Sequence, residues 1–130
     1  MSDPYWEASM TITVRADLRV LPDKREEFVN VAMALAEATS DEVGTLRYDW
    51  YSCADPRAFV VIEEYTDSAA ALAHNQRCEA FLRTLAELAE ITSAHLHGCL
   101  GPELEGWVAE HPFAHAHPPM CQEKPSPRPS

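Results

Sequence analysis

The feature that most constrains the fold is a strict two-residue alternation over residues 11–20, TITVRADLRV. Apolar side chains occupy the even positions from Ile12 to Val20, and polar or charged side chains occupy the odd positions from Thr13 to Arg19. Successive side chains of a strand point to opposite faces of a sheet. The pattern therefore predicts a strand with one buried face and one exposed face.

A helix is expected to follow this strand. Pro22 and Asp23 suit a first helical turn, because proline needs no hydrogen bond there and an acid faces the positive end of the helix dipole. Apolar residues then recur at steps of three and four through about Ser40, which predicts a helix with one core-facing stripe. The members of the stripe are Phe28, Val31, Ala32, Leu35 and Thr39.

The middle of the chain is predicted to form a β-hairpin followed by two helical segments. Residues 45–53 and 58–65 are rich in aromatic and β-branched side chains, and the turn pair Asp55-Pro56 separates them. A short helix is expected over residues 68–74 and a second segment over residues 77–89. Alternation returns in residues 92–100, which predicts a fourth strand.

The resulting order is β-α-β-β-α-β, the split βαβ arrangement of ferredoxin-like α+β domains. We therefore expect a four-stranded antiparallel sheet with helices on one face. The other face would stay open in a monomer, so the sequence favours a homodimer packed sheet to sheet, a dimeric α/β-barrel.

Three segments are expected along the chain. Residues 1–10 form an N-terminal extension, residues 11–104 the folded domain, and residues 105–130 a proline-rich C-terminal arm or tail. Residues 102–130 hold seven of the ten prolines and show no hydrophobic periodicity, which is typical of an extended or disordered segment. Four apolar residues could hold the first part of this arm against a partner subunit: Leu104, Trp107, Val108 and Phe113.

Composition excludes several classes of function. The net charge of −11 repels nucleic acid, and no basic stripe offsets it. No apolar run approaches the roughly 20 residues that span a bilayer, and the first residues do not resemble a secretory signal. We therefore expect a cytoplasmic protein without nucleic-acid or membrane partners. The four cysteines form no CxxC pair, so we expect reduced thiols rather than a zinc site.

Several of these segments together resemble the antibiotic biosynthesis monooxygenase family, which includes quinol monooxygenases. The resemblance covers roughly residues 11–104. It is carried by Glu42-Val43-Gly44-Thr45-Leu46-Arg47-Tyr48, by Asp55-Pro56, by Phe59-Val60-Val61-Ile62-Glu63-Glu64-Tyr65-Thr66-Asp67, and by Ala71-Leu72-Ala73-His74.

The resemblance implies a homodimer with a pocket between sheet and helices in each subunit. It also implies a monooxygenase without metal, flavin or haem, whose electron-rich aromatic substrate, a quinol or polyketide-type phenol, supplies the electrons. Two alternatives stay open on the same fold: a polyketide cyclase or isomerase, and a dimer that binds a small molecule without turnover. Haem is disfavoured, because haem-degrading relatives have a histidine ligand on the second helical segment and residues 77–88 contain none. No second histidine follows His74 closely, which disfavours a mechanism that requires two.

Six residues are candidates for the site. His74 is expected on the short helix facing inward as the catalytic base, since an unperturbed imidazole titrates near pH 6.5. Tyr48 is expected to join it in catalysis. Glu63 would orient His74 or bind a substrate hydroxyl. Trp50, Tyr65 and Phe81 would bind a flat aromatic ring. The alternative is structural: a histidine bonded to Glu63 or a carbonyl, and an ordinary aromatic core. For Glu63 the structural role is favoured, a bond to a helix N-terminus or to an arginine that only fixes the fold.

Two groups of histidines and cysteines are also candidates for metal ligands. His95, His97 and Cys99 share one face of the expected fourth strand, where they give two or three donors in a line and could instead be interface residues. The second group, His111, His115, His117 and Cys121, falls in the proline-rich arm. A flexible tract binds metal weakly, so no metal site is predicted.

Overall fold

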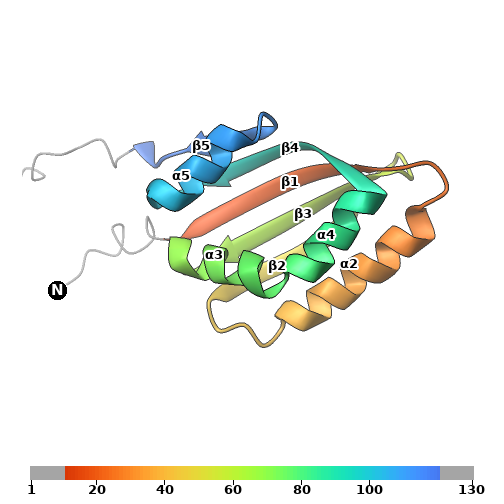
Figure 1. The fold of residues 1–130 in the computed structure, drawn as a ribbon, viewed down its shortest axis with the longest axis horizontal. Coiled ribbons are helices and arrows are strands. Elements are labelled where there is room, and N and C mark those ends of the chain that lie inside the picture. The colour runs from red at the N-terminus through yellow and green to blue at the C-terminus, as the bar shows by residue number, and fades with distance from the viewer. Residues whose placement is uncertain (1–10, 121–130) are drawn as a thin grey trace, which may run out of the picture.

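The computed structural model describes residues 11–120, and Figure 1 shows their arrangement. The strands are β1 (Ile12–Val20), β2 (Thr45–Ser52), β3 (Ala58–Tyr65), β4 (Ala89–His97) and β5 (Ala114–His117). The helices are α2 (Arg25–Thr39), α3 (Ser68–Arg77), α4 (Glu79–Leu88) and α5 (Gly101–Glu110). Through β4 this is the predicted β-α-β-β-α-β order, with the second helical segment split into α3 and α4.

The sheet has the strand order β2-β3-β1-β4-β5. Neighbouring pairs among β1 to β4 are antiparallel, which confirms the ferredoxin-like α+β fold. The prediction of four strands is wrong by one, because β5 adds to the edge of β4 in parallel. Helices α2, α3 and α4 lie over one face of the sheet (Figure 1).

The alternation in β1 places its side chains as predicted. Ile12, Ala16, Leu18 and Val20 are buried, whereas Arg15 and Arg19 are exposed. In β2 the pairing register shifts between Thr45 and Arg47, which leaves Leu46 53% exposed. Leu46 therefore does not share the buried side of β2 with Tyr48 and Trp50, which pack against the core.

The helices are held by the residues that the periodicity indicated. Phe28, Ala32, Leu35 and Thr39 of α2 are all buried. Helix α3 begins after Asp67, whose carboxylate accepts a hydrogen bond from the Ala70 amide at 2.8 Å. An N-cap carboxylate satisfies an amide that has no partner within the helix. This cap fixes where α3 starts and so where His74 lies.

The segment after Gly101 is more ordered than the sequence indicated. Residues 101–110 form α5, with a proline in its first turn, and residues 114–117 form β5. Leu104 is 3% exposed, and Trp107, Val108 and Phe113 pack against the core of the same chain. Proline disfavours only the helix interior, so Pro102 is compatible with α5.

The boundaries of the three expected segments stay predictions. Residues 1–10 and the last ten residues lie outside the described part of the chain. Between residues 11 and 120, no helix is long and apolar enough to cross a membrane.

Candidate functional site

A cavity of about 790 Å³ lies between the helix-covered face of the sheet and the helices α3, α4 and α5. Its floor is formed by inward-facing residues of β1, β3 and β4, including Val14, Val61 and Leu96. Most of the remaining wall is alanine and leucine from the helices. A space of this size and apolar character is typical of pockets for small organic molecules.

Glu63 and Tyr65 bring polar chemistry to this cavity. They are two residues apart on β3, so both side chains point to the helix side of the sheet, and both line the cavity. The Tyr65 hydroxyl donates a short hydrogen bond to Glu63 Oε1. Tyr65 is buried, and Glu63 is half-buried. The pair therefore presents a carboxyl and a phenol together on an otherwise largely apolar wall.

Burial changes how this pair titrates. Loss of hydration raises the pKa of Glu63, although the Tyr65 hydrogen bond and the charge of His74 oppose the shift. Burial and the neighbouring Glu63 charge raise the pKa of Tyr65 far above its usual value. Tyr65 therefore remains a hydrogen-bond donor at neutral pH. A carboxyl with a raised pKa is suited to both accepting and returning a proton.

His74 lies behind this pair rather than on the cavity wall. The ring is 3% exposed, and its centroid lies 5.4 Å from the Tyr65 ring and 5.2 Å from the Tyr48 ring. Its Nδ1 donates to Glu42 Oε1 at 2.9 Å. The inward orientation agrees with the sequence analysis, but the carboxylate that holds the ring is Glu42 and not Glu63. His74 is not among the residues that line the cavity.

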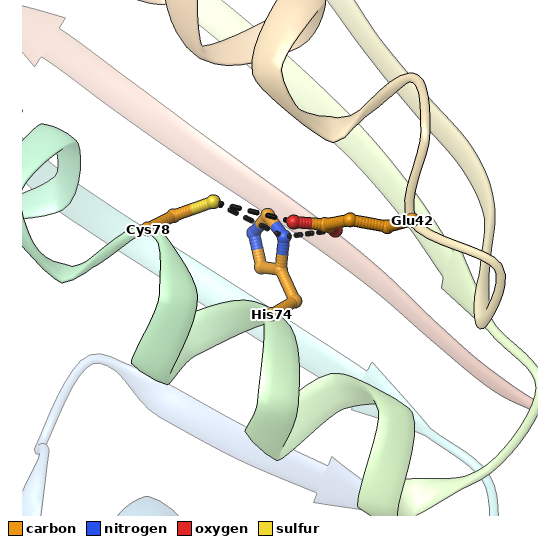
Figure 2. Close-up of side chains that lie close together, drawn as sticks. All are labelled: Glu42, His74 and Cys78. Carbon is orange, nitrogen blue, oxygen red and sulfur yellow. Dashed lines mark hydrogen bonds and ion pairs between the residues drawn. The ribbon is translucent and has the colours of Figure 1, made fainter.

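Glu42, His74 and Cys78 form a compact cluster, shown in Figure 2. Glu42 comes from the loop before β2, whereas His74 lies on α3 and Cys78 follows it. The Cys78 Sγ lies 3.5 Å from Glu42 Oε2 and 3.8 Å from His74 Nδ1. Ligand atoms of all three lie within 4.8 Å of one another, a spacing that could hold a metal ion.

Two observations favour a structural role for this cluster. The Arg77 guanidinium already lies 3.2 Å from Glu42 Oε2 and supplies positive charge to the carboxylate. Burial and the Glu42 charge raise the pKa of the Cys78 thiol to about 11, so it remains protonated at neutral pH. A metal binds the thiolate. We therefore interpret the cluster as an anchor between the loop and α3.

Tyr48 and Trp50 lie on the helix side of β2, as expected. Burial, followed by the Glu63 charge, raises the pKa of Tyr48 far above its usual value, so Tyr48 stays a phenol at neutral pH. Trp50 lines the cavity, whereas Tyr48 does not. Among the described residues, the buried indole Nε1 of Trp50 makes no hydrogen bond of good geometry. It lies near the Tyr48 hydroxyl, and this interaction opposes the rise that burial causes in the pKa of Tyr48. A ligand oxygen would therefore compete with Tyr48 for the indole N–H.

Phe81 lies apart from the main cavity. It lines a second, smaller hollow between α2 and α4 together with Asn30 and Thr84. The prediction that Phe81 contacts substrate therefore has no support from the cavity. The sequence analysis missed α5, which contributes Glu103, Leu104 and Trp107 to the cavity wall. The signal was available, since Leu104 and Trp107 are one helical turn apart.

Residues 11–80 match the antibiotic biosynthesis monooxygenase family. The chain is also 34% identical over 86 residues to the Bacillus subtilis (strain 168) protein named "Putative monooxygenase YcnE". That alignment covers 65% of this chain and 90% of the relative.

The fold of the chain is also similar to those of solved structures. MupZ from Pseudomonas fluorescens has a TM-score of 0.74 and 21% identity, covering 92% of this chain and 96% of that one. A structure from Nitrosomonas europaea named "Putative antibiotic biosynthesis monooxygenase" has a TM-score of 0.64 and 26% identity, covering 72% and 94%. Residues 1–100 make up less than 92% of the chain. The match to MupZ therefore extends into the segment after residue 100.

Proposed function

Because the chain belongs to the antibiotic biosynthesis monooxygenase family, we propose that it oxygenates an electron-rich aromatic substrate, such as a quinol or polyketide-type phenol, without a bound cofactor. The single observation that carries the proposal is the Glu63–Tyr65 pair on the cavity wall. Proton transfer is the step that turns a phenol or an anthrone into an anion able to reduce oxygen. The Glu63–Tyr65 pair can transfer such a proton inside an apolar cavity.

Each residue has a defined part in the proposed reaction. The Glu63 carboxylate removes the substrate proton, and the Tyr65 hydroxyl then moves its single hydrogen bond from Glu63 Oε1 to the substrate oxygen on which negative charge develops. Trp50 offers an aromatic edge and an indole N–H to the ring system. The aliphatic floor excludes water, which keeps the anion reactive.

The reaction balances with dioxygen as the only other reactant. A quinol or an anthrone gives its electrons to O₂. One oxygen atom forms a new bond to ring carbon, and the other leaves as water with two protons. Glu63 carries the proton first removed and returns it to the departing oxygen.

His74 is proposed as a positioning residue in place of the catalytic base expected from the sequence. It packs on the Tyr65 and Tyr48 rings, and its charge lowers the pKa of Glu63. It thus tunes the carboxyl without lining the cavity. Tyr48 lies beside it and acts in the same supporting way.

The test is oxygen uptake by metal-free protein with a panel of hydroquinones and anthrones. We expect Glu63→Gln to lower turnover by about 10²–10⁴-fold, the usual contribution of a general base. Tyr65→Phe should cost about 10²-fold, as loss of one oxyanion donor does. The matched control is Glu64→Gln, the neighbouring carboxyl on the opposite face of β3, which should leave turnover unchanged.

A separate measurement tests the positioning role. His74→Ala removes a charge that lowers the pKa of Glu63, so the pH–rate profile should move to higher pH. Loss of activity without such a shift would argue against the tuning of Glu63. Full activity of Glu63→Gln on every substrate that the wild type oxidises would overturn the role of Glu63 as base, and no oxygen uptake by the wild type with any of the panel would overturn the oxygenase proposal.

A polyketide cyclase or isomerase is the second candidate. The raised pKa of Glu63 favours it equally, because such a carboxyl can enolise a carbonyl without any oxidant. The discriminating measurement is turnover under anaerobic conditions. Product formation without oxygen that is lost in Glu63→Gln would assign the cyclase or isomerase function.

We also propose that the protein is a homodimer packed through the open face of the sheet. Half-buried Val60 and Ile62 lie on that face and offer apolar contact area. Light scattering after gel filtration tests this state. Introducing charge with Ile62→Asp should yield monomers, and a wild-type monomer would refute the proposal.

A further inference from the structure

The fold brings together two histidine pairs that are separate in the sequence. His95 and His97 belong to β4, and His115 and His117 belong to β5. The strands run parallel with His95 opposite His115 and His97 opposite His117. His95 and His97 also pair with Arg15 and Thr13 of β1, whose side chains face away from the core. All four imidazoles therefore lie on the open face.

The four rings form a continuous stack that alternates between the two strands. The order is His115, His95, His117 and His97, with successive ring centroids 4.9, 5.1 and 4.9 Å apart. The interplanar angles lie between 18° and 25°. We call these four residues the histidine ladder. Sequence reasoning treated the β5 pair as part of a flexible arm, so it could not place them beside the β4 pair.

Nitrogen atoms of the ladder already approach one another. His95 Nδ1 lies 2.8 Å from His117 Nε2, so one proton is shared between the two rings. Two nitrogen ligands at about 2.0–2.1 Å from a tetrahedral Zn²⁺ stand roughly 3.3 Å apart. A cation could replace the shared proton if the distance between His95 Nδ1 and His117 Nε2 increased slightly. The proton would then move to the other nitrogen of the ring that carries it.

A further ladder residue is oriented as metal-binding histidines usually are. His97 Nδ1 lies 3.2 Å from the Thr13 carbonyl oxygen, which can only accept, so Nδ1 carries the proton. The lone pair is then on Nε2. A histidine that binds metal commonly donates its other N–H to a backbone carbonyl in this way.

We propose that the histidine ladder binds a divalent transition-metal cation, with His95 and His117 as the two ligands that the structure already brings together and His97 joining them by a movement of its ring. Imidazole is a preferred ligand of Zn²⁺, Cu²⁺ and Ni²⁺. The ladder is exposed except for His95, which is half-buried, and this leaves a coordination site for water. The ladder shares the open face with the proposed dimer contact, but it lies on β4 and the edge strand β5, and β1 separates it from Val60 and Ile62 of β3. Because this face is opposite the cavity, the site is independent of the proposed oxygenation.

The test is calorimetric titration of the metal-free full chain with Zn²⁺. We expect one Zn²⁺ per chain, and both His117→Gln and His95→Gln should weaken binding by at least about tenfold, the lower end of what loss of even an outer-shell partner costs. The matched control is His111→Gln. That imidazole stacks on Trp107 outside the ladder and should not matter.

Two further variants separate the ladder from other possible ligands. Cys78→Ser removes a ligand from the buried cluster, and Cys121→Ser removes a thiol outside the described residues; both should retain wild-type affinity. The proposal is overturned if His117→Gln binds Zn²⁺ as tightly as wild type, or if either cysteine variant abolishes binding. Circular dichroism of each variant confirms that the fold is intact.

Discussion

The two faces of the sheet are built from alternating residues of the same strands, yet they carry opposite kinds of chemistry. On the helix-covered face, Glu63 is desolvated and its pKa is raised. On the open face of a single chain, charged residues pair while still partly exposed, as Arg15 does with Asp17 at 3.1 Å and Arg47 with Asp49 at 2.7 Å. The side-chain type is shared, so the environment sets the reactivity.

The two faces also differ in how much their contacts contribute to the stability of the fold. Ion pairs between half-exposed groups contribute little to stability, because water screens them. Apolar side chains on the covered face lose contact with water completely and carry most of the free energy of folding. Substitutions on the two faces and in the loop before β2 test this division, in order of decreasing expected effect.

The largest effect is expected from Phe28→Ala on α2. Phe28 is fully buried and packs on Trp50 and Phe59 at ring-centroid distances of 5.6 and 4.9 Å. Truncation should lower the free energy of unfolding by about 3–5 kcal/mol. On the same helix Met33 is 63% exposed, and Met33→Ala should change it by less than about 0.5 kcal/mol. Urea denaturation measures both, and equal effects would contradict the division.

Glu42→Gln should break a buried pair on the covered face. The Glu42 side chain is 8% exposed and accepts from His74 Nδ1 at 2.9 Å. The Gln amide oxygen can still accept from His74, but the negative charge that strengthens the bond is lost, which should cost up to about 1.5–3 kcal/mol of unfolding free energy. The open-face counterpart, Arg15→Gln, breaks a pair that water reaches and should cost less than about 1 kcal/mol. Similar losses in the two variants would show that burial does not decide the strength of these pairs.

Gly44→Ala tests how closely the loop before β2 approaches α3. A Cβ at position 44 would lie 2.6 Å from the Ala70 Cβ, so the loop or the helix must shift. Overpacking of this kind should cost about 1–3 kcal/mol. At Gly106 of α5 a Cβ would meet nothing within 4 Å. Gly106→Ala should therefore gain about 0.5–1 kcal/mol, and thermal unfolding of both variants measures the contrast.

The smallest effect is the pH dependence of stability that arises from Glu63. Its pKa is raised in the folded state above its ordinary value of 4.5, so between these values the folded protein binds more protons than the unfolded chain. The unfolding free energy therefore falls as pH rises through this window. Glu63→Gln should remove that slope, and denaturation curves between pH 4 and 7 measure it.

Glu42 is predicted to titrate in the opposite sense. Burial alone would raise its pKa, but hydrogen bonds from His74 and Thr45 outweigh burial and lower it. Its contribution to stability is present above pH 4.5 and is lost as pH falls through the lowered value. If Glu63→Gln and Glu42→Gln change the pH dependence of the unfolding free energy in the same direction, the assignment of opposite pKa shifts is refuted.

Much of the fold was predictable from local patterns. The alternation of β1, the stripe of α2 and the hairpin at Asp55-Pro56 each depend on side chains that are close in sequence. The candidate site was predicted only in part. That Glu63 and Tyr65 share a face follows from their spacing of two on β3, and their hydrogen bond is local for the same reason. The position of His74 behind Tyr65 depends on how α3 packs on the sheet, which the spacing does not reveal.

What the sequence determined by itself was the periodicity of each element and hence which side chains could share a face. It determined the ferredoxin-like order of strands and helices for the same reason. Only the tertiary structure decided that Glu42, 32 residues before His74, would be its partner, and that the histidines of β4 and β5 would stand in register. Contacts between distant segments depend on how whole elements pack, and no local pattern encodes that geometry.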